Sequence, residues 1–214
     1  MKKTYFVSGI DTDIGKSYAV GYLAAKWRGE GKRVITQKFI QTGNDDVSED
    51  ILLHRKIMKT ELLPEDKSKL TMPEIFTYPA SPHLAAKIDN RAIRFDKIET
   101  ATKTLLETYD IVLIEGAGGL MVPLTETLLT IDYVEKNRLP LIFVTSGKLG
   151  SINHTLLSFE AIERRGISLD LLVYNLFSMH PDDRIEKDTE EYIRKEVCKR
   201  FPQAQFVKLP RFNY

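Results

Sequence analysis

A stretch near the N-terminus combines glycine, lysine and serine in an order that could bind a phosphate group. It reads Gly9-Ile10-Asp11-Thr12-Asp13-Ile14-Gly15-Lys16-Ser17 and lies between an apolar run and a segment with helical spacing. Glycines let the backbone approach a phosphate, N–H groups at a helix start face the anion, Lys16 supplies positive charge, and Ser17 can ligate Mg²⁺. Five residues separate the glycines, whereas the common phosphate loop has four. The alternative interpretation is an ordinary strand-to-helix turn.

A carboxylate follows a second apolar run, in Asp110-Ile111-Val112-Leu113-Ile114-Glu115-Gly116-Ala117-Gly118-Gly119. Ligands of open parallel sheets bind beyond the carboxyl ends of the strands. Mg²⁺ prefers hard oxygen ligands beside phosphate oxygens. The pattern therefore predicts that a strand ends at Glu115 and that this acid ligates Mg²⁺, at a position where aspartate is commoner.

Two further charged residues are candidates on weaker grounds. Lys38 ends another apolar run, and in a parallel sheet it would reach the same edge as the phosphates, although a surface lysine ending a strand fits equally well. Asp50 begins Asp50-Ile51-Leu52-Leu53-His54. From the residues alone it is interpreted as a carboxylate favoured by the dipole at a helix N-terminus.

The elements that must position these residues are predicted from the spacing of apolar residues. Six short apolar runs, mostly β-branched or aromatic and without clear alternation, suit strands that helices cover on both faces. They are Tyr5–Ser8, Arg33–Gln37, Ile111–Ile114, Leu141–Val144, Leu169–Tyr174 and Phe206–Leu209. Helices are expected over Ser17–Arg28, Ile152–Arg165 and Asp182–Arg200, the last with a charged, solvated face.

The predicted architecture is a single α/β domain over residues 1–214, with three layers in the order α/β/α and a mostly parallel sheet. No repeat or Gly/Ser-rich linker divides the chain. Four prolines interrupt residues 59–82, and this irregular stretch is either a surface excursion or part of a binding site.

Composition excludes several classes of protein. The 214 residues include 31 Lys+Arg and 30 Asp+Glu, a balance that does not favour a polybasic nucleic-acid binder. The single cysteine, Cys198, rules out an internal disulfide and a Cys-x-x-Cys motif. No apolar stretch is long enough for a membrane span or a secretory signal, so a cytoplasmic location is expected. The histidines are scattered, and surface or packing roles are expected for His54, His83, His154 and His180.

In combination, the motifs resemble those of the ATP-dependent dethiobiotin synthetases, a family with the P-loop NTPase fold. They occur in the family's order over about residues 1 to 176, with a weaker echo at Leu209-Pro210. The matching segments are Gly9 to Ser17 with its five-residue spacing, Lys38 with Gln41-Thr42-Gly43, Ser81-Pro82-His83, Glu115 to Gly119, and Lys148-Leu149-Gly150-Ser151-Ile152-Asn153-His154.

The resemblance implies a reaction in which 7,8-diaminononanoate, CO₂ or bicarbonate, and ATP give dethiobiotin, ADP and phosphate. It implies Mg²⁺ as cofactor and a homodimer whose substrate site lies at the subunit interface, with no nucleic-acid or membrane partner.

The resemblance also implies roles for individual residues. Lys38 matches the family's active-site lysine, Lys16 would hold the phosphates, and Thr12 could hydrogen-bond a carbamate. Mg²⁺ would be held by Ser17, Asp50 and Glu115. The remaining nucleotide contacts would come from Asp13, Ile14, Gly15, Tyr18, Gly116, Ala117, Gly118, Asn175, Leu176, Leu209, Pro210 and Arg211. Substrate would contact Thr42 and, across the dimer, the helix start formed by Gly150, Ser151, Ile152 and Asn153, which from the residues alone is a plain N-cap.

Two alternatives share this fold. One is another amide- or ring-forming ligase with the same nucleotide core. The other is a nucleotide-switched partitioning ATPase, a class that usually carries a second lysine five positions before the loop lysine. In this chain Asp11 occupies that position.

Overall fold

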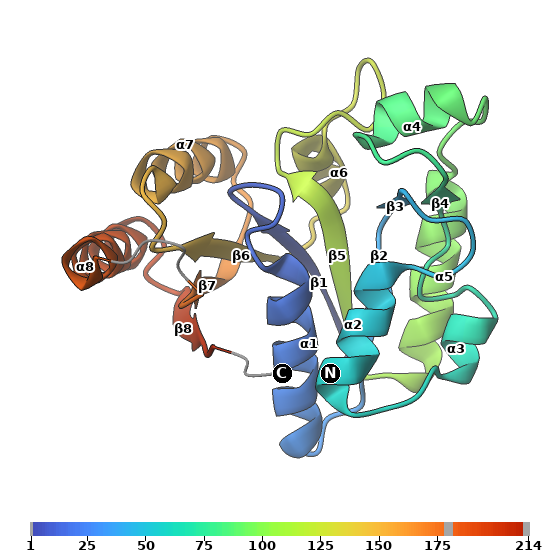
Figure 1. Cartoon of the computed structure of the whole chain (residues 1–214), viewed down its shortest axis with the longest axis horizontal. Helices are drawn as coiled ribbons and strands as arrows, with labels where there is room; N and C mark the ends of the chain where they lie inside the picture. Colours follow the sequence, from blue (N-terminus) through green and yellow to red (C-terminus); the bar gives the residue numbers. More distant parts are fainter. Residues whose placement is uncertain (1, 178–181, 212–214) are drawn as a thin grey trace.

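The computed structural model describes residues 2–177 and 182–211 and contains one central six-stranded sheet (Figure 1). Its strands follow the order β2-β5-β1-β6-β7-β8, and every neighbouring pair is parallel. All six predicted strands are confirmed. They are β1 (Lys3–Gly9), β2 (Val34–Lys38), β5 (Ile111–Gly119), β6 (Leu141–Ser146), β7 (Leu169–Asn175) and β8 (Gln205–Leu209).

Helices cover both faces of the sheet, and each face has its own hydrophobic core. On one face α1 and α2 bury Val20, Leu23 and Met58 against Val7 and Leu113. On the other face α5 to α8 pack against the opposite side chains of the same strands. This is the three-layer α/β/α arrangement that the apolar runs predict. The helices are α1 (Lys16–Gly29), α2 (Glu49–Met58), α3 (Pro64–Lys67), α4 (Pro82–Ile88), α5 (Phe95–Thr108), α6 (Thr130–Lys136), α7 (Ser151–Arg164) and α8 (Asp183–Arg200).

The charged helix α8 behaves as its pattern predicts. Ile193 and Val197 are fully buried and Ile185 is half-buried, while most of the charged side chains face outward. Residues 59–82 contain more regular structure than the prolines suggest. They supply α3 and β4 (Ile75–Phe76), which pairs in parallel with β3 (Gln41–Thr42) in a second, two-stranded sheet.

Strand β5 is longer than predicted, because pairing continues past Glu115 to Gly119. The register between β1 and β5 shifts between Val7 and Gly9, and Gly9 then lies opposite Gly119. A Cβ at Gly116 would lie only 2.8 Å from the Phe6 ring. The small side chains after Glu115 therefore allow the two strands to stay close, and the expectation that the strand ends at the acid was wrong.

Candidate active site

The phosphate-loop residues join β1 to α1 and leave the start of α1 open to a ligand. Gly15 is the N-cap residue in the left-handed conformation, with φ of 93°, and no acidic residue occupies the first helical turn. A Cβ at Gly15 would come within 2.4 Å of the Asn175 amide nitrogen, so only glycine fits. The partial positive charge of the helix start is therefore not neutralised by a neighbouring side chain of that turn.

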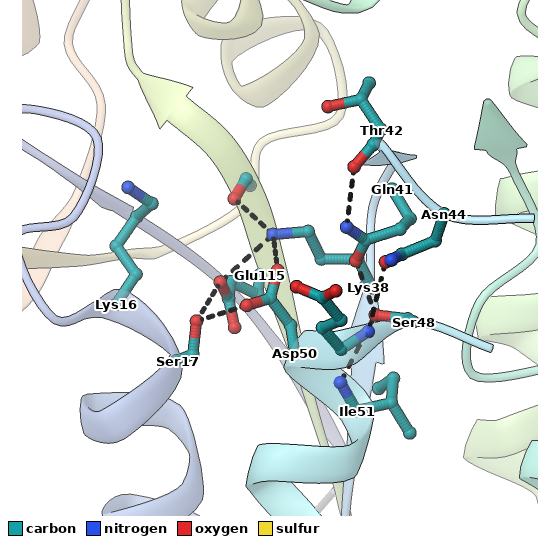
Figure 2. A network of polar contacts seen from close by, with 12 residues as sticks. Lys16, Ser17, Lys38, Gln41, Thr42, Asn44, Ser48, Asp50, Ile51 and Glu115 are labelled. Carbon is teal, nitrogen blue, oxygen red and sulfur yellow. Dashed lines mark hydrogen bonds and ion pairs between the residues drawn. The ribbon is translucent and has the colours of Figure 1, made fainter. Parts of the chain in front are cut away.

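Lys16 lies beside this helix start and is buried. Its ammonium donates a hydrogen bond to the Asp11 carbonyl at 2.8 Å, and its side chain points away from the nearby carboxylates (Figure 2). Burial lowers the pKa of Lys16 more than the surrounding charges raise it. A buried cation bonded to a neutral carbonyl is well suited to receive an anionic ligand.

Four elements bring a hydroxyl, two carboxylates and an ammonium together at the edge of the sheet (Figure 2). The Ser17 hydroxyl lies 2.6 Å from Asp50 Oδ1 and 2.8 Å from Glu115 Oε1. The Lys38 ammonium lies 3.0 Å from the same Glu115 oxygen, 3.3 Å from the Gly116 carbonyl, and in contact with Asp50. The pairing of Lys38 with Glu115 across β2 and β5 places these two side chains side by side.

The charge state of this cluster follows from its surroundings. Only 1 % of the Glu115 side chain and 6 % of the Lys38 side chain are exposed. Burial alone would raise the pKa of Glu115, but Lys38 and the hydrogen bond from His54 outweigh it and hold that pKa far below its ordinary range. Burial would lower the pKa of Lys38, but Glu115 and Asp50 reverse the effect and raise it. Both groups are therefore ionised at neutral pH.

The donor set of this cluster fits Mg²⁺. The two carboxylates and the Ser17 hydroxyl present hard oxygen atoms within hydrogen-bond distance of each other. Among residues 2–177 and 182–211, no three His, Cys, Asp or Glu side chains form a metal site by themselves. Because Mg²⁺ usually takes one or two carboxylates and completes its shell with phosphate oxygens and water, the arrangement suits an ion bound together with a nucleotide.

These residues line a common cavity of about 460 Å³. Most of the predicted phosphate, metal and substrate residues border it. Its walls are formed by Thr12, Asp13, Gly15, Lys16, Ser17, Tyr18, Lys38, Ile40, Gln41, Thr42, Asp50, Leu53, Glu115, Ala117 and Gly118. The structure thus brings together groups that lie more than 100 residues apart in the chain.

Thr42 is connected through hydrogen bonds to the N-terminal end of α2, which carries Asp50. The Gln41 side-chain nitrogen donates to the Thr42 carbonyl at 2.9 Å, and its oxygen accepts from Ser48 Oγ at 2.6 Å. Ser48 is the N-cap of α2 and accepts from the Ile51 N–H at 3.2 Å. Asp50, in the first turn of that helix, is therefore positioned relative to the strand that carries Thr42 (Figure 2).

A second, smaller cavity of about 160 Å³ adjoins the first at Asp13, Gly15 and Tyr18. Its other walls come from Asn175, Phe177, Leu209 and Pro210. Phe177, which the sequence patterns did not single out, is 67 % exposed.

The amide group of Asn175 forms hydrogen bonds within the chain. Its nitrogen donates to the Ile14 carbonyl at 2.9 Å, and its oxygen accepts from the Phe177 N–H at 3.0 Å. Leu176 does not border the smaller cavity, since its side chain packs with the core on the opposite face of the sheet. Arg211 lies outside as well and donates from Nε to the Leu176 carbonyl at 3.0 Å. The contacts tie the end of β7 to the phosphate loop.

The four residues at the start of α7 lie apart from both cavities. Gly150 is the N-cap in the left-handed conformation, with φ of 94°, and has no side-chain cap. Gly150 and Asn153 are exposed and Ile152 is half-buried, whereas Ser151 is buried beside Ser146. None of the four borders the phosphate-loop cavity of the same chain.

His54 is a second residue of the site whose place there the sequence patterns missed. It is fully buried, with Nε2 at 2.7 Å from Glu115 Oε2 and Nδ1 at 3.1 Å from Thr36 Oγ1. A signal was present, because His54 lies four residues after Asp50 and therefore on the same face of α2. Of the other histidines, His83 contacts the Ser81 hydroxyl, His154 is exposed, and His180 lies outside the described residues.

Comparisons with known proteins agree on fold and family. A family profile described as an AAA domain matches residues 3–205. The chain is 50 % identical over 206 residues to an ATP-dependent dethiobiotin synthetase of Pasteurella multocida, covering 96 % of each. It is 55 % identical over 175 residues to the protein of that name from Haemophilus influenzae, covering 82 % of this chain and 92 % of the relative.

Solved structures show similarity of fold alone. A ParA family ATPase from Chlorobium tepidum aligns with a TM-score of 0.55 at 14 % identity, covering all of this chain and 86 % of that one. Chloroplast FtsY from Physcomitrella patens gives the same TM-score at 13 % identity, covering 99 % of this chain. The chain spans 60 % of that protein's resolved length. Among the described residues, no helix has both the length and the apolar character that crossing a bilayer requires.

Proposed function

The chain belongs to the ATP-dependent dethiobiotin synthetases, ligases of biotin biosynthesis, and we propose that its phosphate-loop cavity is where 7,8-diaminononanoate, CO₂ and ATP react. One observation carries the proposal. Ser17, Asp50, Glu115 and Lys38 converge beside the phosphate loop, so groups suited to Mg²⁺ and phosphate lie next to a buried ammonium.

In the proposed reaction one substrate amine adds to CO₂ and loses a proton, which gives a carbamate. The carbamate oxygen attacks the γ-phosphorus of ATP, the bond to the β-phosphate oxygen breaks, and ADP leaves. The second amine then attacks the carbonyl of the mixed anhydride, phosphate departs, and the ureido ring closes with loss of the amine proton. No covalent bond to the protein is needed, so the enzyme acts by positioning reactants and neutralising charge.

The phosphate loop is proposed to hold the β- and γ-phosphates. Backbone N–H groups from Asp13 to Ser17 would face them at the start of α1, joined by the Lys16 ammonium. Ser17, Asp50 and Glu115 would hold Mg²⁺. When bound there, the ion would neutralise negative charge on the phosphate oxygens. The strand continues after Glu115 with Gly116, Ala117 and Gly118, and these residues would lie beside the nucleotide.

Lys38 is proposed to act on the group being transferred. Its ammonium is fixed between the carboxylates, borders the cavity, and stays charged. There it would offset the negative charge of the carbamate and of the transferring phosphoryl group. Thr12 and Thr42 border the same cavity and would donate hydrogen bonds to the carbamate and the diamine.

The smaller cavity is proposed as the base site. Asn175, Leu209 and Pro210 line it, and the cavity adjoins the phosphate site at Gly15 and Tyr18. Leu176 and Arg211 do not line this cavity. They would support it through the hydrogen bond from Arg211 Nε to the Leu176 carbonyl.

The helix start at Gly150 is proposed to bind the substrate carboxylate of a neighbouring subunit in a homodimer. Gly150 and Asn153 are exposed, and the first turn of α7 contains no acidic residue, as an anion site requires. Because the segment does not border the cavity of its own chain, this role depends on assembly. Light scattering would test whether the protein is a dimer. Mixing two variants, one inactivated at Lys38 and the other at Ser151, would test whether the two subunits share a site. Restored activity in the mixture supports a shared site, and no restoration contradicts it.

The reaction is tested by incubating the protein with ATP, Mg²⁺, bicarbonate and 7,8-diaminononanoate and measuring products by mass. We expect dethiobiotin and ADP in equal amounts, with ADP release dependent on the diamine. ADP release that does not depend on the diamine would contradict the proposal and favour a nucleotide-switched ATPase.

A further inference from the structure

A buried hydrogen-bond chain runs from α2 and α3 to the candidate metal ligand Glu115. Its members include Asp66, Arg55, Thr36 and His54, all of which are buried. Arg55 donates from Nε and Nη2 to Asp66 at 2.8 and 2.7 Å, and from Nη1 to Thr36 Oγ1 at 2.9 Å. His54 then joins Thr36 to Glu115. Asp50 and His54 lie on the same helix, so α2 contacts the metal site at two points.

The donors and acceptors of this hydrogen-bond chain favour one position for the hydrogen of the His54 ring. Thr36 has one hydroxyl hydrogen, and its oxygen already accepts from Arg55. Among the described residues, the acceptor that its hydrogen reaches is His54 Nδ1, at 3.1 Å. With the Thr36 hydrogen donated to Nδ1, that nitrogen is the acceptor, and the ring hydrogen is assigned to Nε2, directed at Glu115 Oε2 at 2.7 Å.

We propose that His54 is a positioning residue for Glu115 that carries its ring hydrogen on Nε2 and holds Oε2, leaving Oε1 directed at Ser17 and Lys38. The proposal rests on the proposed role of Glu115 as a Mg²⁺ ligand. Oε1 is the oxygen within 2.8 Å of Ser17 and 3.0 Å of Lys38, and Oε2 is the oxygen bonded to His54. The two carboxylate oxygens therefore have separate partners.

The type of acid explains why such a residue is needed. Glutamate has one more rotatable bond than the aspartate common at this position, so its carboxylate can adopt more orientations. The Glu115 side chain is buried, and without a donor its Oε2 would lose a hydrogen bond without gaining water. A histidine donor fills this role and leaves the negative charge of the carboxylate available to a metal ion.

The first test is spectroscopic and uses the unaltered protein. Long-range ¹⁵N–¹H correlation spectra distinguish a ring nitrogen with hydrogen from one without, and the His54→Gln variant identifies the His54 signals by their disappearance. We expect hydrogen on Nε2 and none on Nδ1. Hydrogen on Nδ1, alone or together with Nε2, would overturn the proposal. The Thr36→Val variant should broaden or shift the Nδ1 signal, because it removes the donor.

The second test measures metal binding directly, by electron paramagnetic resonance of Mn²⁺ titrated in the presence of ADP. His54→Leu should weaken Mn²⁺ binding by about 10- to 100-fold. His54→Gln, whose amide can still donate to Oε2, should recover most of that loss. Ile193→Val in α8 alters a buried residue on the opposite face of the sheet and is the control for lost packing. Thermal unfolding of each variant confirms that the folded protein is being titrated.

The outcomes separate this proposal from the reaction itself. Unchanged Mn²⁺ binding in folded His54→Leu, or a loss in His54→Gln as large as in His54→Leu, would overturn the positioning role even if the wild-type protein makes dethiobiotin. If the wild-type protein makes no dethiobiotin, a His54-dependent Mn²⁺ affinity would still support positioning while the proposed function fails.

Discussion

The two ends of the candidate nucleotide site are built in different ways. At the proposed phosphate and metal end, Lys16, Lys38 and Glu115 are buried and Asp50 is partly buried, and each has at least one hydrogen-bond or ion-pair partner. At the base end, a smaller cavity is bordered by an exposed Phe177 and by residues tied together through backbone and amide contacts. The first end depends on the chemistry of particular side chains, and the second depends more on shape. Substitutions should therefore affect rate at one end and nucleotide affinity at the other.

Lys16→Ala should give the largest effect. The variant removes the buried cation beside the helix start, which is proposed to contact phosphate both in the bound nucleotide and in the transition state. We expect kcat/KM for ATP to fall by roughly 10³-fold or more. Steady-state kinetics measure this, with circular dichroism as a check on folding. A folded variant with wild-type turnover would show that the lysine is not a phosphate ligand.

Lys38→Met should slow the chemical step while ATP still binds. The ammonium lies between Asp50 and Glu115 rather than at the helix start, and methionine keeps most of the side-chain volume. We expect kcat to fall by about 10²- to 10³-fold, with ADP affinity, measured by calorimetry, changed by no more than about 3-fold, or roughly 0.6 kcal/mol. Parallel losses in affinity and kcat would instead place Lys38 among the phosphate-binding residues.

Glu115→Gln should act through the metal. The amide keeps the shape of the side chain but loses the negative charge that faces Ser17 and Lys38. We expect the Mg²⁺ concentration for half-maximal activity to rise by about 10- to 100-fold. A titration of activity against Mg²⁺ at fixed ATP measures it. If the Mg²⁺ dependence is unchanged, the carboxylate does not ligate the ion.

Phe177→Ala should give the smallest effect and define the other end of the site. The side chain is 67 % exposed and borders the smaller cavity. Loss of one aromatic contact should raise KM for ATP by about 3- to 10-fold and leave kcat nearly unchanged. Phe177→Leu keeps an apolar side chain, so its KM for ATP should lie between those of the wild-type protein and Phe177→Ala. A fall in kcat with unchanged KM would remove the distinction between the two ends.

The sheet could be predicted from the sequence because buried parallel strands are continuous apolar runs. The sequence also predicts that Lys38 and Glu115 reach the same edge of a parallel sheet, since both come at the ends of such runs. Their direct pairing could not be predicted, because it depends on β2 and β5 being neighbours. The extension of β5 to Gly119 could not be predicted, because glycines give no strand signal and pairing there depends on contact with β1.

Side-chain partners were harder to predict than elements. The spacing of Asp50 and His54 places both on one face of a helix, but which strand that face meets is a property of the tertiary fold. Only the tertiary fold brings Thr36 and Glu115 within hydrogen-bond distance of His54. Phe177 follows the end of β7 without any motif, and its place beside Leu209 depends on the pairing of β7 with β8.

The most direct test compares the two ends in one experiment, by rapid-quench measurement of dethiobiotin formation in a single turnover at saturating ATP and Mg²⁺. We expect Phe177→Ala to form product at close to the wild-type rate, and folded Lys38→Met to be slower by about 10²-fold or more. Equal slowing of both variants, or a wild-type rate in Lys38→Met, would contradict the assignment of the chemistry to the cluster of Ser17, Lys38, Asp50 and Glu115.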